Sequence, residues 1–445
     1  MKAGVKSVTV ITGSILLSCL IFLLSPGPAH FINHPTNWEF REQLVYLTGA
    51  CAMSLMVVSM LISARIAWVS HLMKGLDKGY IVHKWTGIFS AIFVVGHFLM
   101  ENVPHWLVES GIINDPGELT DASHFTELEI ALFQSGVTLV QPAFYIMIVI
   151  VVIALFKKIP YHWFRKSHRC FPVVFLIAAY HGATAQLKES WLGSSGSFLL
   201  ILILLIGSAA AILSLSKNIG ASRKVSATIS NIEVHEDGIL DLRLTTENNS
   251  FNYQPGQYAF LKFPHNDEPH PFSIASSDRE REVLRFAIKR LGDFTSQLPE
   301  HLHIGQTVQI EGPYGEFQFN DHCEHQVWIA GGIGITPFMA RLDYLANTQK
   351  KQSVNFFYST RSNKDESFPL SLEQSCALSG VNFYHFNSTR KEYVTVDLIK
   401  SKVGNLRNTS IWFCGPAAFA ECIQRGLKSS GFNMSHFHYD SFSMR

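Results

Sequence analysis

Six long apolar segments in the first half of the chain constrain its fold more than any other feature of the sequence. A helix that crosses the hydrocarbon core of a bilayer needs about 20 mostly apolar residues. Six stretches among the first 220 residues meet that requirement. The sequence therefore predicts a bundle of six transmembrane helices at 8–25, 44–64, 81–100, 137–156, 170–187 and 197–216.

The first apolar segment is also compatible with a signal peptide. Lys2 and Lys6 precede it, and residues 27–29 form a candidate cleavage site. The apolar run from Val8 to Leu24 is long for a signal peptide, whose apolar core usually has about 7–15 residues. We expect an uncleaved anchor, and cleavage would leave the predicted orientation of the other segments unchanged.

Lysine and arginine residues indicate how the predicted helices are oriented. Segments on one side of the membrane carry 14 of them up to Lys224, whereas the other side carries only Arg41 and Lys188. Cytoplasmic segments of membrane proteins are enriched in basic residues. We therefore expect both termini, and with them residues 221–445, in the cytoplasm.

The second half has the composition of a soluble protein. The whole chain has 16% charged residues and a net charge of +1, which argues against a disordered chain and against a nucleic-acid-binding protein. None of the seven cysteines is in a Cys-x-x-Cys motif, which disfavours an iron–sulfur cluster, a zinc site and a disulfide framework. The second half therefore suits a reducing cytoplasm.

Four histidines lie within two of the predicted helices, where ionisable residues usually have a function. The third helix carries His83 and His97, and the fifth begins near His168 and carries His181. Both helices run from inside to outside, so His83 shares a depth with His168, and His97 with His181. The 14 residues from His83 to His97 rise about 21 Å and return to nearly the same face. Two stacked pairs of imidazoles are typical of the axial ligands of two haem groups.

The spacing of 13 residues between His168 and His181 is less regular, because an ideal helix places them about 140° apart. Pro172 suggests that the helix starts near His168, which would place this histidine on a less regular first turn. Two other interpretations are open. The histidines are structural residues of a packed bundle, or they relay protons or ions beside a regulatory nucleotide-binding module.

The residues after 220 predict two domains of different type. Residues 221–322 contain short strands separated by turns, which indicates an antiparallel β-barrel. Residues 323–445 alternate strands and helices, which indicates a parallel α/β sheet. Residues 1–220 form the predicted membrane domain. The predicted strands are 224–234, 239–246, 258–263, 272–275, 282–290, 307–311, 326–330, 354–358 and 411–414, with helices near 336–348 and 417–430.

Three short motifs in these two domains are candidate ligand-binding segments, and two of them, 331–338 and 292–295, could bind phosphate groups. The glycine-rich loop 331–338 follows an apolar strand and opens a helix, so that its backbone amides can approach a pyrophosphate. Residues 270–273 follow another strand, and residues 292–295 follow a third and open a short helix. Taken alone, the latter two motifs are equally explained as turns.

These residues together resemble the NADPH oxidase / ferric reductase family over about residues 44–445. Members of that family join a six-helix membrane domain with two haem groups to a module like ferredoxin–NADP reductase. Their haem-binding histidines are spaced by 14 and 13 residues, as His83/His97 and His168/His181 are here. The resemblance implies an inner haem b held by His83 and His168, and an outer haem b held by His97 and His181. It also implies that the chain uses FAD and NADPH.

The resemblance implies roles for residues of the soluble half as well. It places Ser273 at the isoalloxazine ring, Cys414 beside the hydride-transfer site and Phe442 over the flavin, with Tyr439 as second choice for that aromatic. We expect the first three to be the catalytic residues. The residues expected to bind FAD are Tyr258, His270, Pro271, Phe272, Ser273, Lys289, Gly292, Thr295 and Phe442. The residues expected to bind the nicotinamide dinucleotide are Gly331, Gly332, Gly334, Thr336, Pro337, Arg361, Cys414, Gly415 and Pro416.

Two positions bear on the electron donor and the electron acceptor. Arg361 is similar to the arginine that binds the 2′-phosphate of NADPH, while the nearby Asp365 and Glu366 keep NADH open. The oxygen-reducing branch of the family can carry a second histidine four residues after the outer ligand His97, where this chain has Glu101.

The sequence thus leads to one expected function and one alternative acceptor. We expect an NAD(P)H-dependent flavohaem oxidoreductase that passes electrons across the membrane to dioxygen and forms superoxide. The alternative is the reduction of a ferric or cupric chelate at the outer face. Because no EF-hand or iron–sulfur module is recognised, the chain resembles minimal bacterial-type members, and we expect it in a bacterial inner membrane.

Overall fold

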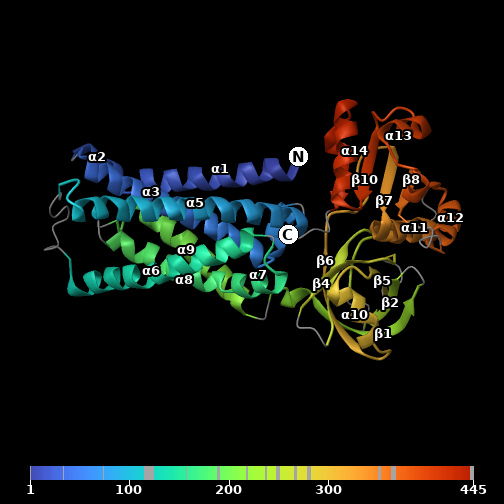
Figure 1. Ribbon diagram of the computed structural model, residues 1–445, viewed down its shortest axis with the longest axis horizontal. Helices are drawn as coiled ribbons and strands as arrows, with labels where there is room; N and C mark the ends of the chain where they lie inside the picture. Colours follow the sequence, from blue (N-terminus) through green and yellow to red (C-terminus); the bar gives the residue numbers. More distant parts are fainter. Residues whose placement is uncertain are drawn as a thin grey trace. The chain divides into compact units, whose positions relative to one another are not determined.

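Contacts in the computed structural model divide the chain into two compact units. Met1–Met73 and Lys78–Ile219 form a helical unit, and Gly220–Arg445 with Lys74–Asp77 form a mixed α/β unit (Figure 1). The structure describes residues 2–33, 35–73, 75–114, 125–156, 158–187, 191–216, 219–235, 238–246, 251–264, 268–277, 282–348, 352–361 and 367–440.

Every apolar segment that the sequence predicts as a spanning helix is helical in the structure. Five helices are long and apolar enough to cross a membrane, and α1 with α2 forms a sixth candidate with a bend of 56°. The predicted helical membrane region is confirmed. The helices are α1 (Lys2–Leu23), α2 (Gly27–Asn33), α3 (Asn37–Ser63), α4 (Ala67–Leu72), α5 (Leu76–Glu109), α6 (Glu127–Leu155), α7 (Tyr161–His168), α8 (Phe171–Thr184) and α9 (Ser195–Leu215).

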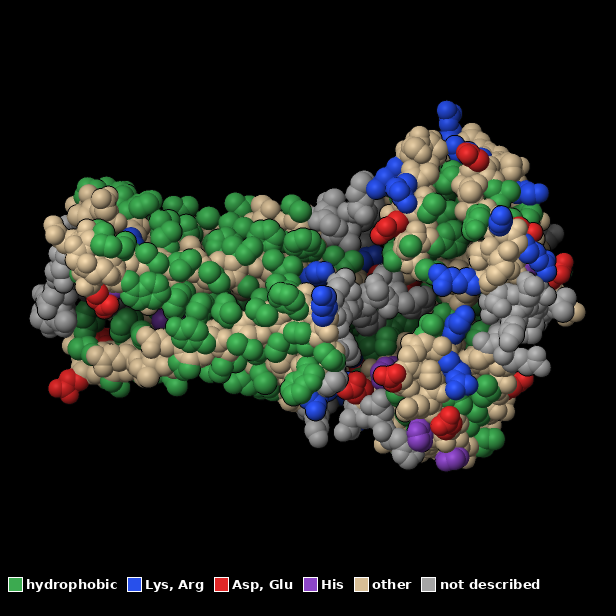
Figure 2. All heavy atoms as spheres, viewed as in Figure 1, with side chains coloured by type: hydrophobic (Ala, Val, Ile, Leu, Met, Phe, Trp, Pro, Cys, Tyr) green, Lys and Arg blue, Asp and Glu red, His purple; other side chains and the backbone are tan. Residues whose placement is uncertain are grey.

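Helix α3 packs against α1, α8 and α9, while α6 packs against α8 (Figure 1). Small polar side chains allow such helices to approach closely. The buried Ser18 hydroxyl lies 3.1 Å from the Ala50 carbonyl oxygen and 2.9 Å from the Ser54 hydroxyl oxygen, which joins α1 to α3. Hydrophobic side chains cover most of the visible face of this unit (Figure 2). That surface suits a lipid environment, in which polar groups are costly.

The expectation that His168 lies on the first turn of the helix that carries His181 is wrong. His168 is the last residue of α7, and α8 begins at Phe171. Between the two helices the Cys170 amide donates to the carbonyl of Ser167, three residues earlier rather than four. This tighter winding turns the chain by about 120° per residue. The break therefore changes the direction of His168 relative to that in an ideal helix.

Six antiparallel strands form the first domain of the mixed unit, in the order β4-β3-β6-β1-β2-β5. A bridge between Ile274 and Phe286 brings the two edges together, so the sheet is a nearly closed barrel. Apolar side chains such as Leu242, Leu261 and Ile310 fill its core. The elements are β1 (Lys224–Val234), β2 (Ile239–Thr246), β3 (Tyr258–Lys262), β4 (His270–Ser273), β5 (Val283–Lys289), α10 (Asp293–His301) and β6 (Thr307–Tyr314).

Five parallel strands form the second domain, in the order β11-β10-β7-β8-β9. Helices α11 and α12 cover one face of this sheet, and α13 and α14 cover the other. Ligands bind such sheets at the carboxyl ends of the strands where the strand order reverses, here between β7 and β10. The elements are β7 (His325–Gly331), α11 (Thr336–Thr348), β8 (Ser353–Thr360), α12 (Ser367–Ser379), β9 (Asn382–Asn387), α13 (Val396–Val403), β10 (Thr409–Cys414), α14 (Ala417–Ser429) and β11 (Phe437–Asp440).

Candidate functional site

The four histidines of the helical unit form two pairs at two levels of the bundle. His83 and His97 lie on α5, His168 ends α7, and His181 lies on α8. The ring centres of His83 and His168 are 5.9 Å apart, and those of His97 and His181 are 6.3 Å apart. The structure brings together the same two pairs that the sequence predicts, while their role as haem ligands stays a prediction.

A carbonyl group of α3 accepts a hydrogen bond from each histidine of α5. The Nδ1 of His83 lies 3.1 Å from the Ser59 carbonyl oxygen, and the Nδ1 of His97 lies 2.9 Å from the Val45 carbonyl oxygen. Because a carbonyl oxygen only accepts, each Nδ1 carries a proton, and in the neutral ring Nε2 keeps its lone pair. This tautomer binds a metal ion through Nε2, and the second hydrogen bond fixes the plane of the ring.

The ring separation in each pair fits an iron ion between the two rings. A nitrogen ligand binds a first-row metal ion at about 2.0 Å, which sets the centres of two opposed imidazole rings about 6 Å apart. The buried Nδ1 atoms of His168 and His181 have no hydrogen-bond partner among the described residues. Within the same residues, no group of three His, Cys, Asp or Glu side chains is suited to a bare metal ion. Paired histidines suit an iron whose remaining ligands come from a porphyrin.

Two glycines allow neighbouring helices to approach the outer pair. A Cβ atom added to Gly49 of α3 would lie 3.3 Å from the ring of His97. A Cβ atom added to Gly136 of α6 would lie 2.2 Å from the Thr184 hydroxyl oxygen and 3.4 Å from the Cα atom of His181. The backbones of α3 and α6 therefore pack against the histidine-bearing helices at distances that larger residues would disturb.

The two segments that the resemblance assigns to FAD lie together in the barrel domain. His270 begins β4, and its ring stacks on that of Phe294 in α10, with ring centres 3.7 Å apart. Gly292 precedes α10 with a φ of 134°, which favours glycine, and Thr295 lies in the first turn. The free amides at the start of a helix favour a phosphate group. The arrangement is therefore compatible with FAD phosphates at the start of α10.

Ser273 ends β4 and pairs with Tyr258 of β3. Its hydroxyl is buried and has no hydrogen-bond partner among the residues that the structure describes. A buried polar group without a partner costs about 1–3 kcal/mol, so the position fits a ligand that makes this bond. Pro271 and Phe272 precede it in β4, and Lys289 ends β5.

The glycine-rich loop after β7 packs directly on the loop after β10. A Cβ atom added to Gly334 would lie 2.3 Å from the Cys414 carbonyl oxygen, and one added to Gly331 would lie 2.8 Å from the Cδ atom of Pro416. A Cβ atom added to Gly415 would lie 3.0 Å from the Gly331 nitrogen. The two predicted nucleotide-binding motifs therefore interlock at the point where the strand order reverses.

A short 3₁₀ turn separates the glycine-rich loop from α11. It covers Gly332–Ile335, and α11 begins at Thr336. The Thr336 hydroxyl donates to the Ile333 carbonyl oxygen at 2.7 Å. Pro337 occupies the first turn of α11, where its missing amide hydrogen costs nothing.

Cys414 is fully buried at the end of β10, where it pairs with the buried Asp440 of β11. Burial raises the pKa of the Cys414 thiol well above its usual range, and the Asp440 carboxylate raises it further. The thiol is therefore neutral over the physiological pH range, which excludes a role as a thiolate nucleophile. Asp440 was not predicted as a site residue, although an acidic residue at the end of the last apolar strand was an available signal.

Two further predicted residues, Arg361 and Tyr439, lie near the ends of strands in the parallel sheet. Arg361 is exposed just after β8, at the sheet edge that carries the glycine-rich loop, because β7 and β8 are adjacent parallel strands. Tyr439 lies in β11, and its ring centre is 5.6 Å from that of Phe413. Phe442 and both acidic residues that follow Arg361 lie outside the described residues.

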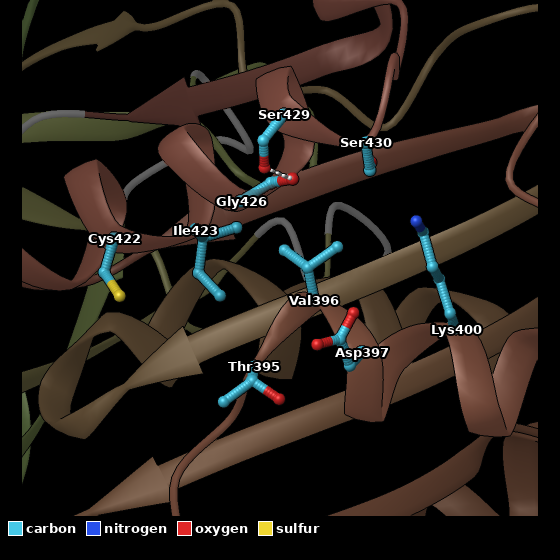
Figure 3. Close-up of a pocket in the computed structure, with 9 residues that line it drawn as sticks. All are labelled: Thr395, Val396, Asp397, Lys400, Cys422, Ile423, Gly426, Ser429 and Ser430. Atoms are coloured by element: carbon cyan, nitrogen blue, oxygen red, sulfur yellow. Dashed lines mark hydrogen bonds between the residues drawn. The ribbon is translucent and has the colours of Figure 1, made fainter.

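A cavity of about 430 Å³ lies between α13 and α14 (Figure 3). Thr395, Lys400 and Cys422 are among the side chains that line it. None of the predicted site residues belongs to its lining. The cavity is therefore separate from the interlocked loops after β7 and β10.

Three family models match successive parts of the chain. The ferric reductase like transmembrane component matches residues 48–179. The FAD-binding domain matches residues 224–318, and the oxidoreductase NAD-binding domain matches residues 328–425. Oxidoreductase chemistry with FAD and a nicotinamide dinucleotide therefore belongs to the mixed unit, which follows a ferric-reductase-like membrane region.

Individual relatives match about half of the chain. The reductase component of propane 2-monooxygenase from Mycolicibacterium smegmatis is 26% identical over 238 residues, which are 49% of this chain and 68% of that protein. The glycine betaine monooxygenase reductase subunit of Chromohalobacter salexigens is 27% identical over 208 residues, which are 43% of this chain and 56% of that protein. A cytochrome P450 reductase of Amycolatopsis has a TM-score of 0.45 and 21% identity, covering 50% of this chain and 71% of that structure.

The three matches occur in one chain and in one order, and the helices and sheets of the structure agree with them. The protein therefore has the architecture of the NADPH oxidase / ferric reductase family: an integral membrane region followed by an FAD-binding and an NAD-binding domain.

Proposed function

We propose that this protein transfers electrons from NAD(P)H on one side of a membrane, through FAD and two haem b groups, to an acceptor on the other side. The observation that carries the proposal is the stacking of two histidine pairs at two levels of the helical unit. A hydrocarbon core of about 30 Å is too thick for one haem group to bridge. Two groups at two depths would divide that distance.

In the helical unit, His83 and His168 would hold the inner haem b, and His97 and His181 the outer one. The hydrogen bonds from α5 to the carbonyl groups of α3 support this assignment, since they leave Nε2 of both α5 histidines free. When bound, the haem groups would pass single electrons, and FAD would accept a hydride. The protein would supply their order, their spacing and their electrostatic surroundings.

In the mixed unit, the buried Ser273 hydroxyl would bond the isoalloxazine ring, and the start of α10 would hold the phosphates of FAD. The interlocked loops after β7 and β10 would hold NAD(P)H. The neutral Cys414 would give the nicotinamide an uncharged wall that excludes water. Phe442 would cover the flavin until the nicotinamide displaces it.

The nicotinamide dinucleotide is proposed to be NADPH, with NADH as the alternative. Arg361 lies exposed at the sheet edge where the dinucleotide would bind. A guanidinium group binds a phosphate through two parallel hydrogen bonds, and NADH lacks the 2′-phosphate that Arg361 would contact.

The proposed acceptor is dioxygen. One NADPH would reduce two dioxygen molecules, giving NADP⁺, one proton and two superoxide anions, so electrons and charge balance. Because each iron would have two histidine ligands, dioxygen would react at the edge of the outer haem rather than on its iron. The chain would provide access to that edge at the outer end of α5.

A second acceptor is favoured by the residue at position 101. Glu101 lies one turn after His97, its side chain is 46% exposed, and it pairs with Arg41. The oxygen-reducing branch of the family can carry a histidine at this position, and this chain lacks it. Reduction of a ferric or cupric chelate is therefore the alternative activity.

The proposed location is a bacterial inner membrane, with both termini and the mixed unit in the cytoplasm. The distribution of Lys and Arg supports this orientation, with 14 on the inner segments and two on the outer ones. In this orientation NAD(P)H would reach the mixed unit from the cytoplasm, and the acceptor would lie outside it.

Spectroscopy of the purified protein tests the haem assignment first. The reduced-minus-oxidised spectrum should show b-type haem bands for two groups per chain. Their absence would refute the proposal and favour the histidines as relay groups of a proton or ion pathway.

Proteoliposomes with NADPH outside then distinguish the acceptors. Reduction of cytochrome c that superoxide dismutase suppresses, with both proteins inside the vesicle, would support dioxygen. Turnover with internal ferric citrate under anaerobic conditions, without superoxide in air, would support the metal reductase.

A further inference from the structure

Helix α5 contains a proline close to its outer histidine. Pro104 has no amide hydrogen, so it leaves the carbonyl group of Met100, four residues earlier, without its helical partner. Met100 lies three residues after His97, so this weak point adjoins the turn that carries the histidine.

Arg41 of α3 supplies the missing hydrogen bond. Its Nε donates to the Met100 carbonyl oxygen at 2.9 Å, and its Nη2 donates to the Glu101 carbonyl oxygen at 2.9 Å. The same Nη2 pairs with the Glu101 carboxylate. The Arg41 side chain is 11% exposed. One largely enclosed guanidinium therefore contacts three acceptor groups where α5 lacks a backbone hydrogen bond.

Arg41 belongs to a row of α3 residues that faces His97. Arg41, Val45 and Gly49 are spaced by four residues and lie on one side of the helix. The Val45 carbonyl accepts from the histidine, and Gly49 allows the ring to approach. At the inner level the Ser59 carbonyl corresponds to that of Val45, but the inner part of α5 contains no proline.

We propose that Arg41 is a positioning residue for the outer pair. It replaces the backbone hydrogen bond that Pro104 removes, and it thereby fixes the turn of α5 that carries His97. The inference rests on the proposed function, because the occupant of the pair is taken to be a haem. It adds that the turn of α5 beside the outer pair is held by a charged side chain of another helix. The inner pair lies about 21 Å further along α5 and is independent of Arg41.

The test compares full-length variants that remove the side-chain bond, the proline or the charge. Arg41→Gln replaces the long, forked guanidinium that reaches both carbonyl groups with a shorter, uncharged amide. Pro104→Ala restores a backbone amide four residues after Met100, so the double variant regains a partner for that carbonyl. Glu101→Gln removes the charge of the ion pair and leaves both backbone acceptors in place.

Haem content per chain and the low-spin electron paramagnetic resonance signals are measured in each variant. The outer signal is identified as the one lost in His181→Ala. We expect Arg41→Gln to weaken haem retention at the outer pair about tenfold and to shift its signal, as substitutions next to metal ligands commonly do. The inner signal should stay unchanged.

The double variant should regain outer-haem retention to within about twofold of Pro104→Ala, and Glu101→Gln should retain it. If the double variant is as impaired as Arg41→Gln, or if Glu101→Gln is equally impaired, the proposal is overturned. If Arg41→Gln does not accumulate in the membrane, the double variant with Pro104→Ala should accumulate. A double variant that also fails to accumulate would overturn the proposal. A parent protein without any outer signal would instead refute the proposed function itself.

Discussion

The predicted cofactor sites of the helical unit and the mixed unit are built from different groups: side chains in the first and backbone in the second. In the helical unit the contacting groups are four imidazole side chains, and the two on α5 donate hydrogen bonds to α3. In the mixed unit the two predicted nucleotide-binding loops are rich in glycine and pack backbone against backbone. The first site should therefore be most sensitive to the loss of a side chain, and the second to the addition of one.

The largest effect is expected from removing one histidine of the outer pair. His181→Ala should lose one of the two haem groups, because an iron with a single axial histidine is held weakly. Reduction of the flavin by NADPH should persist, since the mixed unit is unchanged. Haem content and stopped-flow flavin absorbance measure the two outcomes.

The matched control for this change is His105→Ala, at the exposed outer end of α5 and outside both pairs. It should retain both haem groups. If His181→Ala retained both haem groups, the helical unit would not be sensitive to the loss of this side chain, and the expected difference between the two units would be wrong.

The reverse change in the mixed unit adds one methyl group to the interlocked loops. Gly334→Ala would place a Cβ atom 2.3 Å from the Cys414 carbonyl oxygen, so the backbone must shift. Displacement of a binding group by about 1 Å can lower a rate about 100-fold. We expect that loss in the reduction of flavin by NADPH, with haem content unaffected.

Gly380→Ala is the control for this change. Gly380 has a φ of 67°, and an added Cβ atom meets no atom within 4 Å. It should lose about 1 kcal/mol of stability through backbone strain while the reduction rate remains normal. Equal rates for the two variants would argue against backbone packing as the basis of the nucleotide crevice.

A smaller effect is expected where the mixed unit does use a side chain. Ser273→Ala removes a buried hydroxyl that has no protein partner among the described residues. If FAD makes that bond, its loss costs about 1–1.5 kcal/mol, or about a tenfold weaker affinity for FAD. Ser277→Ala removes another buried, unpartnered hydroxyl and should leave the affinity unchanged. Titration of the deflavinated protein with FAD measures both affinities. An equal loss of affinity in the two variants would contradict the assignment.

The smallest effect is expected at the exposed rim of the nucleotide site. Arg361→Gln should raise the KM for NADPH about fivefold, because an exposed ion pair contributes about 1 kcal/mol or less. The KM for NADH should stay unchanged. Arg407→Gln, exposed just before β10, is the control. Steady-state flavin reduction with each nucleotide measures the two KM values. An equal rise in the KM for NADH would argue against contact between Arg361 and the 2′-phosphate.

The local patterns of the sequence were sufficient for most of the fold. Apolar length predicted the helices, and turn residues at short intervals predicted a barrel that the bridge at Ile274 nearly closes. The spacing of His83 and His97 predicted their common face, because both lie on one uninterrupted helix. These features depend on neighbours within a few turns of the chain, which the sequence displays directly.

The direction of His168 could not be predicted in the same way. The regular spacing fails there because α7 ends and α8 begins between it and His181. Whether a helix continues or breaks before a proline depends on the packing of both halves. Asp440 was missed for a related reason, since only the pairing of β10 with β11 places it beside Cys414.

The sequence by itself determined that a membrane region precedes a flavin and nucleotide module, because apolar length, basic residues and glycine motifs act locally. Only the tertiary structure decided how the two α5 histidines are held. His97 and Val45 are 52 residues apart, and Arg41 and Met100 are 59 apart. Hydrogen bonds over such separations follow from which helices pack together. Their packing selects which ring nitrogen is free and where α5 is braced, and it is a property of the folded bundle.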